Sequence, residues 1–313
     1  MEKSELNLEG PKNGLAREYY ESGAIKSETS FKDDKKEGLA REYYESGALK
    51  SETPYIDGKK EGLAREYYES GALKSETPYK DDKEEGLEKC YNENGTLDFE
   101  CPYKDGEKDG LAKWFYESGA VFVQICYGQG VKWQGKGFYE SGKLEYEFIV
   151  KEDTQDVFLM FYYESGEVEG EKPYKDGKCE GLSKSYYKSG AIKSETPYKT
   201  GQREGLAKSY YESGELENEA TYRDGKAEGL AKEYYKNGAI KSEMPFQAGK
   251  REGLVKFYGE NGELWSTFEF KDDSPVKGWW PNDDGSETPL TEAEMEERGR
   301  WLYLLGLPFR HLV

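Results

Sequence analysis

One stretch decides the fold of this chain: residues 62–80 read GLAREYYESGALKSETPYK. A nearly identical stretch begins at Gly38, and more degenerate copies make up most of the remaining sequence. Each copy contains a turn glycine, and successive turn glycines lie 24 residues apart, except for one step of 23. These glycines are Gly23, Gly47, Gly71, Gly95, Gly119, Gly142, Gly166, Gly190, Gly214, Gly238 and Gly262. The chain therefore holds eleven copies of one unit, and such arrays grow in one direction without a single globular core.

Each copy contains two short runs in which residues alternate with a period of two, as in residues 63–68 and 72–79. This pattern is typical of paired β-strands. The intervening Glu69-Ser70-Gly71 fits a three-residue hairpin loop with its glycine in the left-handed conformation.

The loop length fixes which residues face each other across the hairpin, and the pairs should join aromatic with aliphatic side chains and opposite charges. The expected pairs are Tyr67 with Leu73, Glu66 with Lys74 and Leu63 with Thr77. Because side chains alternate along a strand, this register predicts a core face of Leu and Tyr and an outer face of Glu and Lys.

We therefore predict an all-β repeat array: an elongated, twisted, single antiparallel sheet of about eleven 24-residue β-hairpins with a short C-terminal α-helical cap. The expected boundaries are an N-terminal lead-in over residues 1–13, the array over 14–270 and a C-terminal loop and helix cap over 271–313. Within the array, the repeats over 114–163 are degenerate.

The C-terminal region departs from the repeat. Residues 278–281 (Gly-Trp-Trp-Pro) are predicted to form a loop with two aromatic anchors. Thr291 and Glu294 have the spacing of a capping box, so a helix is expected over residues 292–305. A cap over the last repeat is favoured over a partner-binding helix, because repeat arrays need protected ends.

Composition limits the class of partner. The formal net charge is −19, and the mean hydropathy of −1.01 would suggest disorder if the chain did not contain 27 tyrosines, because disordered chains are poor in aromatic residues. An acidic surface repels nucleic acid and anionic membranes and attracts basic proteins, although solubility alone explains the charge equally well. The chain begins without the apolar segment of a signal peptide and contains no membrane-length apolar run, so we expect a cytoplasmic protein.

No catalytic constellation is present in the sequence. The single histidine is His311, and the four cysteines are Cys90, Cys101, Cys126 and Cys179, none of them in a CxxC pair. Clustered ligands are therefore lacking for a metal, and reduced thiols are expected. Phosphate-binding glycine loops and nucleophile elbows are missing as well. We expect no catalytic residues, no cofactor and no enzyme activity; a catalytic C-terminal segment would be too short to fold alone.

The repeat is most degenerate at its centre, where apolar side chains replace polar ones on both faces. Such strands are buried on both sides or expose a patch that something else covers. Internal packing and a partner site with aromatic anchors therefore both remain open. The candidate partner-binding residues, including two from the C-terminal region, are Trp114, Phe122, Trp133, Leu159, Phe161, Tyr163, Trp279 and Trp280.

The recurring pattern G-L-A-[RK]-x-Y-Y-x-[SN]-G-x-[LI]-K-S-E-x-P-Y-x-x-G resembles the bacterial variant of the MORN repeat, over roughly residues 14–270. Proteins of this kind are similar to the YwqK-like antitoxins. The resemblance implies an elongated β array that binds other proteins, most specifically an antitoxin or immunity protein that neutralises a cognate toxin. The net charge of −19 favours a basic toxin. We expect the protein to act as a monomer without nucleic acid or membrane contact. A structural scaffold or adaptor for protein complexes is the alternative.

Overall fold

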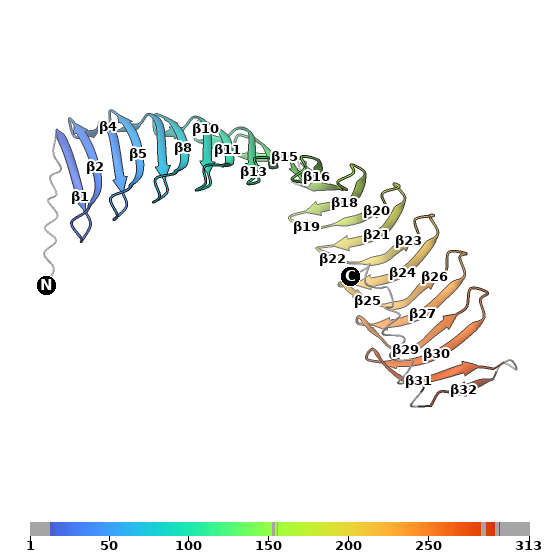
Figure 1. Cartoon of the computed structure of the whole chain (residues 1–313). Coiled ribbons are helices and arrows are strands. Elements are labelled where there is room, and N and C mark those ends of the chain that lie inside the picture. Colours follow the sequence, from blue (N-terminus) through green and yellow to red (C-terminus); the bar gives the residue numbers. More distant parts are fainter. Residues whose placement is uncertain (1–12, 152–153, 155, 283–285, 292–293, 295–313) are drawn as a thin grey trace. The chain divides into compact units, whose positions relative to one another are not determined.

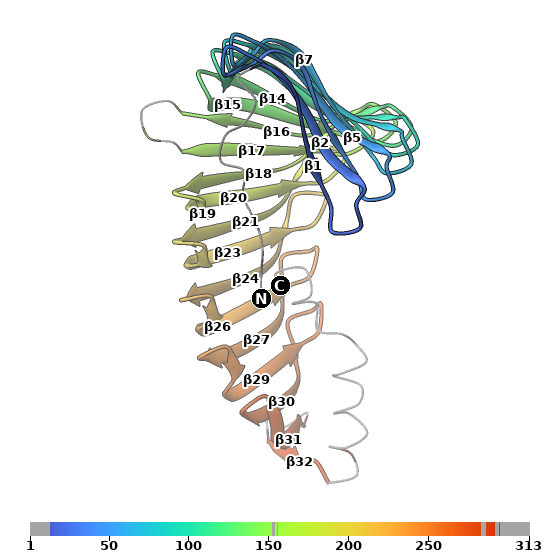
Figure 2. The same cartoon turned by 90° about the vertical axis from the view of Figure 1, so that its left-hand side faces the viewer.

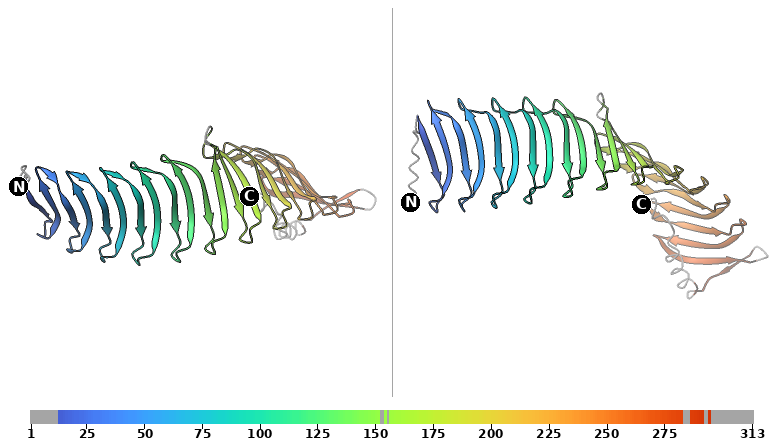
Figure 3. Two further views of the ribbon diagram at one scale, coloured as in Figure 1. Left: turned by 90° about the horizontal axis from the view of Figure 1, so that it is seen from above. Right: turned by 45° about the horizontal axis from the view of Figure 1, so that its top comes forward.

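The computed structural model describes residues 13–151, 154, 156–282, 286–291 and 294. Its strands pair antiparallel with their neighbours in an open sheet of successive hairpins. The chain divides into two compact units, unit 1 over residues 1–150 and unit 2 over residues 151–313. Within each unit the hairpins follow one another in sequence order (Figures 1 and 3), which confirms the predicted β-hairpin array.

The described part of unit 1 contains sixteen strands. They are β1 (Gly14–Tyr19), β2 (Ile25–Lys32), β3 (Lys35–Lys36), β4 (Gly38–Tyr43), β5 (Leu49–Ile56), β6 (Lys59–Lys60), β7 (Gly62–Tyr67), β8 (Leu73–Lys80), β9 (Lys83–Glu84), β10 (Gly86–Tyr91), β11 (Leu97–Lys104), β12 (Glu107–Lys108), β13 (Gly110–Phe115), β14 (Val121–Gly128), β15 (Val131–Phe138) and β16 (Leu144–Val150).

The strands of unit 2 run from β17 to β32 and are seen in order in Figure 2. They are β17 (Val157–Tyr162), β18 (Val168–Lys175), β19 (Lys178–Cys179), β20 (Gly181–Tyr186), β21 (Ile192–Lys199), β22 (Gln202–Arg203), β23 (Gly205–Tyr210), β24 (Leu216–Arg223), β25 (Lys226–Ala227), β26 (Gly229–Tyr234), β27 (Ile240–Gln247), β28 (Lys250–Arg251), β29 (Gly253–Tyr258), β30 (Leu264–Lys271), β31 (Ser274–Pro281) and β32 (Glu287–Pro289).

The hairpin of β7 and β8 represents the repeat. Its loop is closed by two backbone hydrogen bonds, from Tyr68 N to Ala72 O (2.8 Å) and from Gly71 N to Tyr68 O (2.9 Å). Gly71 has a φ of 88°, a conformation that glycine adopts without steric cost. The predicted three-residue loop and the predicted Tyr67–Leu73 pair are both confirmed.

A β-bulge next to this loop changes the register of the rest of the hairpin. Past Tyr67 and Leu73, the partner of Glu66 is Ser75, which leaves Lys74 as the extra residue of the second strand. Arg65 then pairs with Glu76, and Leu63 with Pro78 instead of Thr77. The predicted Glu66–Lys74 and Leu63–Thr77 pairings are wrong, although the Lys74 ammonium still reaches the Glu66 carboxylate at 3.3 Å.

The bulge determines which side chains share a face of the sheet. We call the two sides the leucine face and the small-residue face. In β7 and β8 the leucine face carries Leu63, Arg65, Tyr67, Leu73, Glu76 and Pro78, and the small-residue face carries Ala64, Glu66, Ser75, Thr77 and Tyr79. Because the repeat length is even, these assignments recur from copy to copy.

Burial confirms the predicted core at the position of Tyr79, which Tyr222 occupies, and contradicts it at the position of Leu63, which Leu206 occupies. In β23 and β24 the small-residue face is buried, with Ala207, Ala220 and Tyr222 exposing 0%, 1% and 7% of their surfaces. Leu206, on the leucine face of the same hairpin, is 46% exposed. The leucine that was expected to form the core therefore lies on the more open side, since the one-residue shift exchanges the faces.

Successive copies are joined by a second, tighter turn. In copy three this turn is Asp81-Asp82, whose φ angles of 50° and 69° fit a two-residue hairpin turn. The chain then bulges at Glu85 and re-pairs with the preceding copy, where Cys90 faces Ser75.

The C-terminal region differs from its prediction. Residues 278–281 belong to strand β31, which pairs with β30 through Trp279 and Thr267, so the predicted loop is wrong. The chain forms one more hairpin at the turn Asp272-Asp273, which has positive φ angles like the other inter-copy turns. The residues after this turn therefore form a strand. The sheet thus extends beyond residue 270 through β31 and β32.

Only Glu294 of the helix predicted over residues 292–305 is among the described residues; the rest of the predicted cap lies outside them, and the described residues contain no complete helix. Its capping box is present: the Glu294 carboxylate accepts from the Thr291 backbone N at 2.8 Å and from the Thr291 hydroxyl at 2.7 Å. The lead-in over residues 1–12 also lies outside the described part of the chain. Asn13 closes the first copy by accepting a hydrogen bond from Asp33 N at 2.9 Å.

Candidate protein-interaction surface

The two tyrosines of each repeat have separate structural roles. The second tyrosine donates its hydroxyl to a backbone carbonyl of the next copy, as from Tyr68 to Tyr91 O at 2.8 Å and from Tyr211 to Tyr234 O at 2.7 Å. Each of these bonds joins one copy to the next. We call the series the tyrosine ladder, and it stabilises the array along its length.

The first tyrosine of each pair donates to a glutamate of the preceding copy. Tyr67 Oη lies 3.1 Å from Glu52 Oε1, and the same glutamate lies 3.4 Å from the Arg65 guanidinium. Arg65 also meets Glu76 at 3.0 Å. The leucine face therefore carries a row of alternating positive and negative side chains, in which the repeated carboxylates contact arginine and tyrosine side chains.

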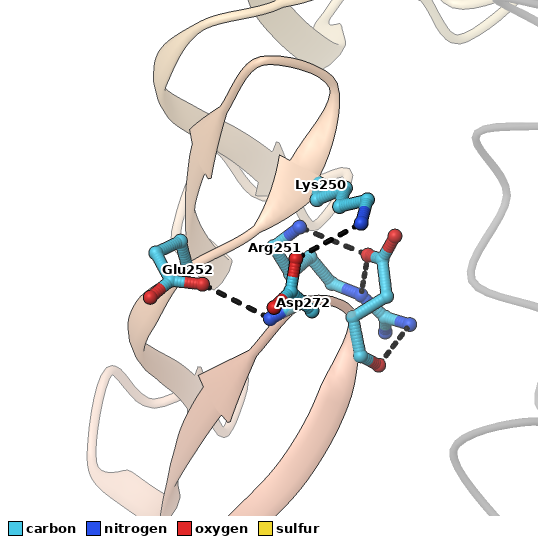
Figure 4. A network of polar contacts seen from close by, with 5 residues as sticks. Lys250, Arg251, Glu252 and Asp272 are labelled. Carbon is cyan, nitrogen blue, oxygen red and sulfur yellow. Dashed lines mark hydrogen bonds and ion pairs between the residues drawn. The ribbon is translucent and has the colours of Figure 1, made fainter.

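A third set of contacts holds the inter-copy turns. Figure 4 shows it in unit 2, where Glu252 accepts a hydrogen bond from Asp272 N at 3.0 Å and Lys250 meets the Asp272 carboxylate at 2.9 Å. Arg251 donates to Asp273 Oδ1 at 3.1 Å. Among the described residues, no three His, Cys, Asp or Glu side chains are grouped to hold a metal ion.

A row of exposed apolar side chains follows the leucine face. We call it the leucine row. Its members occupy the position after the first-strand glycine, and each exposes between 38% and 50% of its surface. In unit 1 they are Leu15, Leu39, Leu87 and Leu111, and in unit 2 they are Phe158, Leu182, Leu206, Leu230 and Leu254. Exposed apolar side chains that recur along one face of a soluble protein can contribute to an interaction site.

Proline packing fixes the backbone beside the leucine row. Pro78 faces Leu63 across the hairpin, and a Cβ atom added to Gly86 of the next copy would lie 3.1 Å from Pro78 Cγ. At Gly110 the corresponding distance to Pro102 Cγ is 2.8 Å. In five copies the glycine before the exposed leucine lies against the proline of the copy before; these glycines are Gly86, Gly110, Gly181, Gly205 and Gly253.

The predicted partner-binding residues of unit 1 have different environments. Trp114 lies 4.7 Å from Phe99, ring centroid to ring centroid, and packs against the buried cluster of Cys101, Ala112 and Tyr127. Phe122 is 40% exposed. Trp133 lies in strand β15, but its side chain is outside the described part of the structure. Internal packing therefore explains Trp114, and Phe122 is the more accessible candidate.

The predicted residues of unit 2 are half-buried. Leu159 and Phe161 lie on β17, and the Lys172 ammonium stands 5.8 Å from the Phe161 ring centroid. Tyr163 has a structural role, because its hydroxyl donates to Tyr186 O at 2.7 Å in the tyrosine ladder.

Trp279 and Trp280 lie on β31 and are also half-buried. The most exposed aromatic side chain that the sequence analysis missed is Trp265, at 60%. It occupies the bulge position of the last regular copy, where most early copies carry lysine, and that replacement could have identified it.

The cysteines are structural. All four are free thiols, as the sequence predicted. Burial raises the pKa of the Cys90 and Cys101 thiols to about 11, which disfavours the reactive thiolate. No described helix is long and apolar enough to cross a membrane.

The fold defines the chain as a β-hairpin repeat array, and the family comparison identifies the repeat. The MORN repeat variant family matches ten segments that together make up more than half of the chain: residues 12–33, 36–57, 60–81, 84–105, 108–128, 160–176, 180–200, 203–224, 227–248 and 251–272. The chain therefore belongs to the MORN repeat variant family. The copy around Gly142 lies between these matches, yet its loop is closed by the usual bond, from Gly142 N to Tyr139 O at 2.8 Å.

No curated protein matches the chain. Similar solved structures include one described as TcdB2-TccC3-Cdc42, at 13% identity, covering 88% of this chain and 18% of that chain with a TM-score of 0.18. Another, TcdB2-TccC3, shows 12% identity over 88% of this chain and 17% of that chain, also at a TM-score of 0.18. This chain spans less than a fifth of the length of either, and at such TM-scores the similarity carries no argument about fold or function.

Proposed function

We propose that this protein is a non-enzymatic binding protein that engages a protein partner through the leucine row. The observation that carries the proposal is the exposure of one apolar side chain at the same position in nearly every copy. A register set by a recurring bulge holds these side chains outward, and in several copies, as at Gly205 before Leu206, glycine–proline packing supports the adjacent backbone.

The repeated polar side chains support a binding role over a catalytic one. The tyrosines, the arginine or lysine and the glutamates of the repeat are engaged in contacts between strands and copies, as in the set around Glu52. Side chains committed in this way hold the array together, whereas a catalytic centre needs a few groups gathered in one site.

The net charge of −19 favours a basic partner. We propose an antitoxin or immunity protein that covers a basic toxin, because opposite charge accelerates encounter and the apolar row supplies contact area. The protein would act in the cytoplasm as a monomer. It would bind neither nucleic acid nor membrane, because its charge repels both.

The test uses the full-length tagged chain expressed in its native cell. Leu206→Lys combined with Leu230→Lys places charge on two adjacent members of the leucine row. The matched control is Ser213→Lys, in an exposed loop between β23 and β24. We expect one basic protein to co-purify with the wild type and the control and to be lost with the double variant. Retention of that partner by the double variant would refute the leucine row as its site.

Salt dependence tests the nature of the partner. With purified components, affinity should fall as salt rises from about 0.05 to 0.5 M, because the Debye length shortens over that range. A salt-independent complex would contradict recognition of a basic protein.

A scaffold is the second candidate, favoured by the near-equivalence of the leucine positions. Several equivalent sites could hold several copies of a partner along one unit. Light scattering of the purified complex separates the two functions: one tight partner per chain fits an immunity protein, and several weaker ones fit a scaffold.

A further inference from the structure

Lysines beside the inter-copy turns form ion pairs from one copy to the next. Lys59, the first residue of β6, meets the Asp81 carboxylate of the following copy at 2.8 Å. Lys250, the first residue of β28, meets Asp272 at 2.9 Å in the same way (Figure 4). In both cases the aspartate is the first residue of the next inter-copy turn, so the pair depends on a lysine and an aspartate at these two repeat positions.

Two lysines of unit 2 lack this pair. Lys178 in β19 and Lys226 in β25 occupy the same repeat position as Lys59. The corresponding turn residues of the following copies are Thr200 and Ala248, which carry no charge. Both lysines are exposed, and neither forms an ion pair within the described part of the chain. Their charges are therefore available to a partner.

The unpaired lysines lie on the leucine face, beside the leucine row. Lys226 faces Arg223 across its turn, and Arg223 follows by two residues Thr221, which pairs with Leu206. Because every second residue of a strand shares a face, Arg223 and Lys226 lie on the same side of the sheet as Leu206, about 7 Å farther along the strand. We call the exposed cations at these positions in successive copies the cation strip: Lys175, Lys178, Lys199, Arg223 and Lys226.

Carboxylates also lie at this margin of the sheet. The turns beside the cation strip contain Asp176 and Asp224. Glu180, Glu204 and Glu228 follow these turns or the turn between them, and their carboxylates accept hydrogen bonds from backbone N–H groups of the next turns. A ligand that fits the strip therefore needs negative charge at defined points, opposite the two unpaired lysines, and not spread evenly along it.

We propose that the leucine row and the cation strip of unit 2 together dock an amphipathic α-helix of the partner protein. The apolar side of this helix packs on Leu182 and Leu206, and acidic side chains on one flank pair with Lys178 and Lys226. This docking surface rests on the proposed function, because it uses the same row, and it adds the chemistry of the segment in contact. That segment can be acidic in a partner whose remaining surface is basic.

The spacing along the array suits a helix. Leu182 on β20 and Leu206 on β23 are two strands apart, which is about 9.6 Å, and helix residues seven positions apart are about 10.5 Å apart. Lys178 and Lys226 are two copies apart, about 19 Å, and helix residues fourteen positions apart are about 21 Å apart. A helix with its side chains is about 10–12 Å wide, so a helix over the leucine row reaches the cation strip with one flank.

An anionic membrane would also offer apolar and negative groups, but two observations favour a helix. Leu182 and Leu206 expose 44% and 46% of their surfaces, so each is partly enclosed by the sheet instead of projecting from it. Asp176 and Asp224 would face the uniform negative charge of the lipid headgroups. A helix avoids this repulsion, because it places its acidic side chains only opposite the lysines.

The test measures the binding of synthetic peptides to the full-length protein by fluorescence anisotropy at low salt. The acidic probe is a labelled peptide of about 22 residues, about 33 Å long as a helix, with leucines along one face and glutamates along one flank. The basic probe carries lysine in place of those glutamates. The broken probe has the acidic sequence with two central residues replaced by proline, which prevents a continuous helix.

Charge reversal identifies the lysines that the probe contacts. The test variant combines Lys178→Glu with Lys226→Glu. The matched control combines Lys188→Glu with Lys236→Glu, which changes the net charge by the same amount. Lys188 and Lys236 are exposed lysines of unit 2 that are also two copies apart, but they lie in the hairpin loops at the opposite margin of the sheet.

We expect the wild type to bind the acidic probe about tenfold more tightly than the basic probe, because one probe gains two ion pairs and the other two repulsions. Lys178→Glu with Lys226→Glu should reverse this order, whereas the control should keep it. Leu182→Ser with Leu206→Ser should weaken both helical probes by about tenfold or more, because apolar contact is lost. The broken probe should bind about tenfold less tightly than the acidic probe.

Equal affinities of the wild type for the acidic and basic probes would overturn the acidic flank, as would an order that the control variant also reverses. Equal binding of the broken and acidic probes would overturn the helix. A third contrary result is binding to phosphatidylserine vesicles that is lost in the Lys178→Glu, Lys226→Glu variant while no probe binds; it would assign the surface to a membrane.

The synthetic probes separate this docking surface from the proposed function. A native partner that is lost with Leu206→Lys and Leu230→Lys would support the proposed function even where the wild type does not distinguish the acidic from the basic probe. Conversely, the expected order of probe affinities without any co-purified partner would support the chemistry of the surface and count against the proposed function.

Discussion

Substituting Tyr234 and Tyr235 one at a time tests the separate roles of the paired tyrosines. Tyr234→Phe and Tyr235→Phe each remove one hydroxyl from the same dipeptide. Tyr234 donates to a carboxylate oxygen of Glu219 at 2.7 Å, whereas Tyr235 donates to the backbone carbonyl of Tyr258 at 2.8 Å. The two variants therefore differ mainly in the charge of the acceptor.

The acceptors set the expected magnitudes. A neutral hydrogen bond contributes about 0.5–1.5 kcal/mol to stability, and one to a charged group about 1.5–3 kcal/mol. Because Glu219 and Tyr234 are only half-buried, we expect Tyr234→Phe to lower the free energy of unfolding by an amount near the lower end of the second range, about 1.5 kcal/mol. For Tyr235→Phe we expect about 1 kcal/mol.

Urea unfolding of the full-length protein, followed by circular dichroism and tryptophan fluorescence, measures both changes. Glu219→Gln provides the control: in that background Tyr234→Phe should cost less, with a coupling on the order of 1 kcal/mol. The reasoning is refuted if Tyr235→Phe destabilises more than Tyr234→Phe, or if Glu219→Gln leaves the effect of Tyr234→Phe unchanged.

Three further predictions follow from the same contacts. Burial and glutamate partners raise the pKa values of Tyr186 and Tyr258 from 10.0 to about 12. The stability that these two tyrosines contribute is therefore full below pH 10 and is lost as the pH rises toward 12. Thermal melts from pH 8 to 12 should show this loss, and a flat profile would contradict it. Cys90, with a pKa near 11, should react with iodoacetamide at pH 8 far more slowly in the native than in the unfolded protein; equal rates would contradict its burial. Gly110→Ala should destabilise by about 1–3 kcal/mol through overpacking against Pro102, and Pro102→Ala should relieve part of that loss in urea unfolding; an unchanged loss would assign the whole effect to the positive φ of 115°.

The sequence predicted those features that local chemistry determines. The spacing of the turn glycines gave the number of hairpins, and Gly71 gave the loop, because a left-handed residue in a three-residue loop strongly favours glycine. The Tyr67–Leu73 pair followed directly from the loop length. Each of these depends on residues within a few positions of one another.

The sequence did not predict the bulge at Lys74. Lysine is compatible with either register, and its charge pairs with Glu66 in both, since the bulged side chain still reaches that carboxylate at 3.3 Å. The bulged register is favoured by contacts between strands and between copies, such as Arg65 with Glu76 and Pro78 with Gly86. The sequence of a single hairpin does not indicate these contacts.

This one-residue shift moves the candidate site. The straight register predicts that the leucines form the core, so it predicts exposed apolar side chains only where the repeat degenerates, around Trp114 and Phe161. With the bulge, the regular copies themselves expose an apolar side chain, whereas Trp114 is partly buried and packs against the cluster of Cys101, Ala112 and Tyr127. The regular copies, more than the degenerate ones, therefore carry the surface that we propose for a partner.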